Sequence, residues 1–109
     1  MKLEVSFKNL RPRNEIRTRA ENLFRKLERF LDQAAESHLT VAVEHSDAVL
    51  ELVVSAHGDT HKATEEHADL RTALDKVFHT MENQLRRSKE RRASRRRDVE
   101  STDGFGAAS

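Results

Sequence analysis

The sequence has no cysteine, tryptophan or tyrosine, and its 109 residues include only one proline and three glycines. Without cysteine the chain can form no disulfide framework, thiol nucleophile or thiolate metal site. No segment approaches the about 18–20 apolar residues that a membrane-spanning helix requires. The first residues also lack the apolar run of a signal peptide. These absences predict one cytoplasmic domain with no membrane partner.

Residue types that could support catalysis or metal binding are scattered along the chain. The glycines are isolated, so no glycine-rich phosphate loop is present, and the serines lack the context of a nucleophile elbow. His57, His61 and His67 resemble a metal-binding spacing, but strand residues four apart lie about 13 Å from each other, and the three straddle a predicted turn. We therefore predict no enzyme activity, no metal, no cofactor and no small-molecule substrate.

Charge is sorted by segment along the chain, although the formal net charge is only +1. Residues 86–97, RRSKERRASRRR, carry eight basic and one acidic side chain, a net of +7. Residues 1–85 and residues 98–109 each carry a net of −3. Within the first part, residues 10–31 have a net of +4 and residues 32–75 a net of −8. Such sorting indicates a polyanionic partner for the basic segments.

Alternation of apolar and polar residues with a period of two predicts four strands, at residues 2–7, 38–45, 48–57 and 60–67. The dipeptides SD and GD are candidate turns between the last three strands, which would form an antiparallel meander. The first two strands are joined through a helical segment, so they would be parallel. The polar fourth strand would lie at an edge of the sheet.

Apolar spacings of three and four predict two amphipathic helices, one roughly over residues 13–35 and one that starts after an N-cap at Asp69 and runs beyond residue 90. The apolar stripe of the second helix ends at Leu85, so the helix must project from the core there or fray. We predict an α+β fold: a β-α-β-β-β-α two-layer sandwich with a four-stranded sheet and both helices on one face. Residues 1–92 would form this domain, and residues 93–109 a basic then acidic, disordered tail.

The basic run in the second helix needs a partner. Two or three cations would suffice to complement the dipole of a helix end, whereas eight repel one another unless an anion neutralises them. Nucleic acid fits this need better than an anionic membrane, an acidic protein or a merely solubilising tail. In the first helix Arg19, Lys26 and Arg29 form a second basic row. All five aromatic residues are Phe and no stacking platform is evident, which favours backbone and shape recognition of double-stranded or folded RNA.

The order of elements, with KLERFLD at 26–32 and DLRTALDKVFHTMENQLRRSKER at 69–91, resembles the ribosome hibernation-promoting factor family, also called ribosome-associated inhibitor or sigma-54 modulation protein. The resemblance covers about residues 1–92 and is to a short form, because only twelve residues follow Arg97. It implies a fold similar to double-stranded RNA-binding domains. It also implies binding to ribosomal RNA of the small subunit, in the channel for messenger and transfer RNA, and inhibition of translation in starved or stationary cells.

The resemblance also supplies candidate contact residues. Basic helix residues of the family correspond here to Lys26, Arg87, Lys89 and Arg91, and Arg86 extends that patch. Together with the first-helix row, the predicted RNA-binding set is Arg19, Lys26, Arg29, Arg86, Arg87, Lys89 and Arg91. The chain departs from the family at Arg71, where an aromatic residue is frequent. We expect a free monomer. The alternatives are a general RNA-binding or RNA-chaperone module and a protein-interaction regulator with a basic tail.

Overall fold

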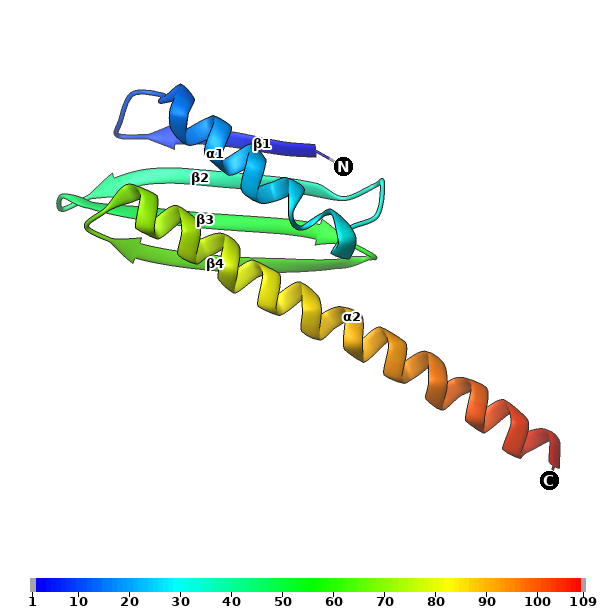
Figure 1. The fold of residues 1–109 in the computed structure, drawn as a ribbon. Helices are drawn as coiled ribbons and strands as arrows, with labels where there is room; N and C mark the ends of the chain where they lie inside the picture. Colours follow the sequence, from blue (N-terminus) through cyan, green and yellow to red (C-terminus); the bar gives the residue numbers. More distant parts are fainter. Residues whose placement is uncertain (1, 109) are drawn as a thin grey trace.

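The computed structural model describes the backbone of residues 2–108 and the side chains of residues 2–94. Its elements are β1 (Lys2–Lys8), α1 (Asn14–Arg25), a 3-10 turn η1 (Glu28–Phe30), β2 (Glu36–Glu44), β3 (Asp47–Ala56), β4 (Asp59–His67) and α2 (Leu70–Ala108). The strands form one sheet in the order β1-β2-β3-β4, with β1 parallel to β2 and the other pairs antiparallel. Both helices lie on the same face of the sheet (Figure 1), which confirms the predicted fold class.

The core lies between the sheet and the helices. In the register of the strands, Val5 pairs with Leu39, Leu39 with Leu52, and Leu52 with Ala63. These positions form one row that faces the helices, because alternate residues of a strand point to the same side. Leu39 and Leu52 are fully buried. The predicted period of two therefore identifies the core face of each strand.

The two hairpin turns lie one residue earlier than the SD and GD dipeptides predict. The β2–β3 turn consists of His45 and Ser46, with φ of 50° and 71°, and the β3–β4 turn of His57 and Gly58, with φ of 54° and 78°. Two successive residues at positive φ form the turn that matches the twist of antiparallel strands. Gly58 takes the second central position, as glycine does in an Asn-Gly hairpin, rather than the first.

The first predicted helix is shorter than expected. α1 ends at Arg25, and the remaining apolar residues are carried by η1 and the residues around it. Leu27 and Phe30 are still buried, at 2% and 5% exposure. A 3-10 turn places residues i and i+3 on one side, so it keeps the apolar spacing that the sequence shows while it ends the α-helix.

α2 begins as predicted. Asp69 Oδ2 accepts hydrogen bonds from the backbone N–H of Thr72 at 3.2 Å and from its hydroxyl at 2.6 Å. Both hydrogen bonds lower the pKa of the Asp69 carboxyl, and the bond from the Thr72 hydroxyl has the larger effect. The predicted apolar stripe packs on the sheet and is buried at Ala73, Leu74, Val77, Phe78, Met81 and Leu85.

Beyond the sheet, α2 projects from the body of the molecule (Figure 1). Its helical backbone continues to Ala108, whereas composition predicts a disordered tail over residues 93–109. A helix end without an apolar surface to pack on depends on propensity alone. The division of the chain at residue 92 stays a prediction, and the side chains of residues 95–109 lie outside the described ones.

Candidate nucleic-acid interface

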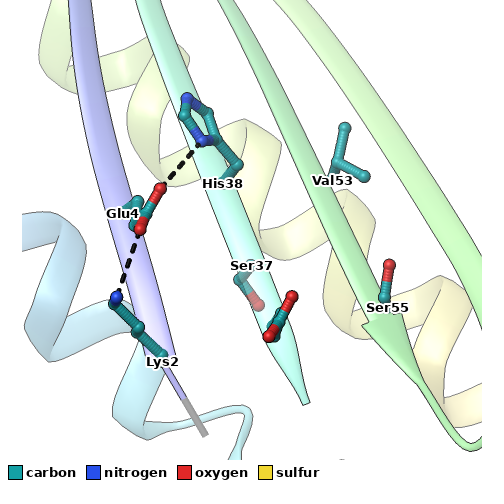
Figure 2. Close-up of a pocket in the computed structure, with 7 residues that line it drawn as sticks. Lys2, Glu4, Ser37, His38, Val53 and Ser55 are labelled. Carbon is teal, nitrogen blue, oxygen red and sulfur yellow. Dashed lines mark ion pairs between the residues drawn. The ribbon is translucent and has the colours of Figure 1, made fainter.

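The open face of the sheet is acidic. Its outward positions carry six carboxylates and three lysines, at Glu4, Glu36, Glu44, Asp47, Glu51 and Glu66 and at Lys2, Lys8 and Lys62. Figure 2 shows one end of this face, where Glu4 forms ion pairs with Lys2 at 3.2 Å and with His38 at 3.6 Å. With a net of three negative charges, this face is a poor surface for a polyanion.

On the helix side of the sheet, ion pairs join α1 and η1 to α2. The three that cross from α1 and η1 to α2 in residues 2–94 are Glu15–Arg71 at 3.2 Å, Arg19–Asp75 at 2.8 Å and Arg29–Glu82 at 3.0 Å. Glu15 also pairs with Arg13, and hydrogen bonding to Arg13 is the main reason that the pKa of the Glu15 carboxyl is lowered. Exposed ion pairs contribute little to stability, so their main effect is to set how the helices align.

Arg19 is engaged within the protein. Its Nε donates to Asp75 Oδ1 at 3.0 Å and its Nη2 to Oδ2 at 2.8 Å, a two-pronged pairing that raises the pKa of the guanidinium. Lys26 lies at the C-terminal cap of α1 and lines a shallow hollow between the helices with Asp75 and Glu82. A role for either residue in RNA binding stays a prediction, and both have carboxylates beside them.

Three predicted RNA-binding residues come together around one aromatic ring, and we name this group the η1 flank: Arg29, Arg86 and Lys89. Their cationic groups lie 4.7, 6.0 and 5.8 Å from the centre of the Phe30 ring. Phe30 is only 5% exposed, so the cations stack over it and leave little of the ring for a base. Glu82 contacts Arg29 at 3.0 Å and Arg86 at 3.5 Å, so two of the three cations share one carboxylate.

The other two predicted residues of α2, Arg87 and Arg91, lie on a different side of the helix. Together with Arg92, which was not predicted, they form what we name the β4 flank. Arg91 and Arg92 line a hollow of about 370 Å³ with Asp59, Thr60, His61 and Ser88. Arg87 is exposed and lies four residues before Arg91, so the two share a side of the helix. Arg92 Nη1 donates to the buried Ser88 Oγ at 3.0 Å, which fixes its position.

The sequence therefore predicts one basic patch on α2, and the structure divides it in two. The spacing of the residues could have predicted this division, because residues three or four apart share a side of a helix. Arg86 and Lys89 are three apart, and Arg87 and Arg91 are four apart. The sequence did not predict Arg92 as a member of the basic set, nor Phe30 and His61 as neighbours of the two flanks. Arg92 follows Leu85 and Ser88 by seven and four residues, the spacing that places it above their buried side.

The histidines that resembled a metal site lie in separate surroundings. His57 pairs with Asp32 at 3.5 Å, while His67 Nδ1 accepts the backbone N–H of Asp69 at 2.9 Å. The described part of the chain contains no group of three or more side chains placed to hold a metal ion. Nor does any helix within it combine the length and apolarity needed to cross a membrane.

Comparisons with known proteins found a matching family and similar proteins. The family described as "Sigma 54 modulation protein / S30EA ribosomal protein" matches residues 3–93. A curated protein named "Ribosome hibernation promotion factor", from Deinococcus radiodurans, is 29% identical over 101 residues. That match includes 87% of this chain and 52% of the relative, so the chain spans about half the length of that protein.

Two solved structures share the fold. The N-terminal domain of Thermus thermophilus Protein Y is 26% identical, with a TM-score of 0.71, and the match covers 76% of this chain and 92% of that one. A ribosomal subunit interface protein from Coxiella burnetii is 17% identical, with a TM-score of 0.73 over 83% of this chain and 99% of that one. The second likeness supports the fold alone.

Proposed function

Because the chain belongs to the sigma 54 modulation protein / S30EA ribosomal protein family, we propose that it is a ribosome hibernation factor. It binds ribosomal RNA of the small subunit in the channel for messenger and transfer RNA and inhibits translation in starved or stationary cells. It acts in the cytoplasm as a monomer, by occupying that channel rather than by catalysis. The name of the Deinococcus radiodurans relative supports the proposal.

The observation that carries the proposal is the placement of charge on the two faces of the domain. Three cations surround Phe30 on the η1 flank and three more lie on the β4 flank. All of them except Arg29, which lies on η1, belong to the part of α2 where packing on the sheet ends. The open sheet face on the other side carries six carboxylates against three lysines. A domain with this polarity presents one side to an RNA surface and turns the other away.

The two flanks also suggest how α2 meets RNA. Cations on opposite sides of a helix are separated by about its 10–12 Å diameter, so both flanks cannot follow one phosphate row. The deep groove of regular A-form RNA is too narrow to admit side chains. We therefore place α2 between two RNA segments of a folded surface. The lining of the messenger and transfer RNA channel offers such segments, and filling it would exclude both RNAs.

A sedimentation profile of stationary-phase cells, probed for this protein, tests the proposal. Co-migration with small subunits or whole ribosomes is expected, and it should be lost after nuclease digestion of the ribosomes. A spread over free RNA would contradict the proposal and favour a general RNA-binding or RNA-chaperone module. A complex that survives nuclease would contradict it in another way, because a protein partner gripped by the basic helix would not depend on RNA.

A further inference from the structure

The hollow on the β4 flank contains a histidine that the proposed contacts leave unused. His61 lies on β4 on the helix side of the sheet, two residues before the buried Ala63. Its Nε2 atom is buried and has no hydrogen-bond partner among the described residues. The same hollow is also lined by Asp59, Thr60, Ser88, Arg91 and Arg92. A ring nitrogen without a partner beside two cations can donate to an anion once it carries a proton.

The charges around His61 come from three elements. Asp59 lies on β4 itself, His57 in the β3–β4 turn, and Arg91 and Arg92 on α2; the β3 neighbour, Val54, is apolar. Burial is the main cause that lowers the pKa of the His61 imidazole, and the two arginines and His57 lower it further, while Asp59 acts in the opposite direction. Burial and the neighbouring cations thus favour the neutral form of the His61 imidazole in the free protein.

We propose that this hollow binds one phosphate group of the RNA backbone and that His61 takes up a proton from solvent as the phosphate binds. The inference rests on the proposed function for the identity of the anion. A bound phosphate would cancel the repulsion from Arg91 and Arg92 and would place a negative charge beside the ring. Protonated His61 then donates Nε2–H to a phosphate oxygen, a charge-assisted hydrogen bond that the neutral ring makes more weakly.

The sign of the pH dependence follows from this linkage. Phosphate binding raises the pKa of His61 above its value in the free protein, which itself lies below the ordinary 6.5. Affinity for RNA is then lowest above the pKa of the bound state and rises as pH falls towards the pKa of the free state. A single proton can change the affinity by at most about tenfold per pH unit. The hollow would thus strengthen the complex when the cell interior becomes acidic.

The test compares wild type with His61→Gln in binding to purified small ribosomal subunits between about pH 8 and about pH 5.5, the range in which histidine titrates. Wild type should gain affinity relative to the variant by several-fold as pH falls, while the two bind similarly at the alkaline end. His38→Gln, on the open sheet face, is the matched control and should keep the wild-type profile. His61→Lys, which is charged throughout, should bind tightly with a flat profile.

Each outcome decides the matter. Parallel pH profiles for wild type and the folded Gln variant would overturn the inference and leave the proposed function standing. If the Gln variant does not fold, a His61→Lys profile as steep as that of wild type would overturn it. A failure of wild type to bind small subunits at any pH would instead refute the proposed function.

A second measurement is independent of the ribosome. NMR titration of the His61 ring with and without sulfate, which stays doubly charged throughout this range, should show a higher pKa in sulfate. If the pKa of His61 were the same with and without sulfate, the hollow would not be an anion site. A raised pKa, combined with parallel ribosome-binding profiles, would assign the hollow to free anions and overturn its role in RNA binding.

Discussion

The two halves of α2 differ in what their side chains contact. From Leu70 to Leu85 the inward side packs on the sheet, and the cations and carboxylates of the outward side pair with α1 and η1. From Arg86 to Ser94 the basic side chains outnumber the acidic ones by five to one. In this second half only Ser88 is buried among the described side chains.

The difference shows how a nearly neutral chain presents a basic surface. In the first half the charges are matched across the helix pair, so they fix geometry and contribute little field. In the second half the helix has left the sheet, and few carboxylates lie within reach of its arginines. If the proposed function holds, the first half of α2 supports the fold and the second half binds RNA. Substitutions in each half should then separate the two roles.

The packed half should respond most strongly to loss of an apolar side chain. Leu74 is fully buried, and Leu74→Ala is expected to lower the free energy of unfolding by about 2–5 kcal/mol, because it removes apolar contacts and leaves a cavity. Lys76→Ala, an exposed change two residues along the same helix, should stay within about 0.5 kcal/mol of wild type. Urea denaturation measures both. Equal effects would mean that this half does not carry the core.

The projecting half should respond in binding and not in folding. Replacing Arg86, Arg87, Lys89 and Arg91 together with Gln is expected to keep the circular dichroism of wild type, because Gln has a similar helix propensity. Affinity for small subunits should fall by on the order of 100-fold or more, since four charged hydrogen-bonding groups are removed. The matched control replaces Arg95, Arg96 and Arg97 with Gln and should lose less. A folded four-residue variant that binds like wild type would show that the RNA contact lies elsewhere.

The start of the packed half can be tested at its N-cap, Asp69. Asp69→Ala should cost about 0.5–2 kcal/mol of stability near neutral pH, while Asp69→Asn should cost less because Asn also caps. The pKa of Asp69 is lowered by folding, so its contribution is complete above the ordinary value of 3.8 and is lost as pH falls below it. Thermal unfolding of wild type and the Ala variant should therefore converge in acid. A gap that persists there would exclude a role for the carboxylate.

A smaller change in affinity should distinguish a cation with its own carboxylate, Arg19, from one that shares a carboxylate, Arg29. Arg29→Gln should weaken small-subunit binding by about fivefold and Arg19→Gln by about twofold, because both prongs of the Arg19 guanidinium contact Asp75, whereas Arg29 shares Glu82 with Arg86. Co-sedimentation at a single low salt concentration is sufficient for the comparison. A larger loss from Arg19→Gln would mean that the Arg19–Asp75 pair opens on the ribosome.

Much of the fold could be predicted from periodicity. The alternation in β3 and the stripe from Leu70 to Leu85 each report a buried side, and both predictions are confirmed. The end of α1 at Arg25 could not be predicted, because a 3-10 turn keeps Phe30 at the same spacing as an α-helix would. The one-residue shifts of the two turns also could not be predicted from the sequence, since Asp and Ser are common at several turn positions.

The candidate site was predictable in composition and not in arrangement. The density of arginine in α2 is a local property of the chain. The grouping of Arg29 with Arg86 and Lys89 around Phe30 is not local, because it depends on how η1 lies against α2. The pairing of Arg19 with Asp75 spans 56 residues of sequence and likewise requires the packed helices.

The salt dependence of small-subunit affinity tests the central claim most directly. If the basic flanks of α2 neutralise RNA phosphates, log affinity should fall linearly with log salt concentration, with a slope of about −3 or steeper for four or more contacts. The four-residue Gln variant provides the reference and should show a slope closer to zero by about 3. A wild-type affinity that stays flat between low and moderate salt would contradict the claim, because binding would then not depend on these cations.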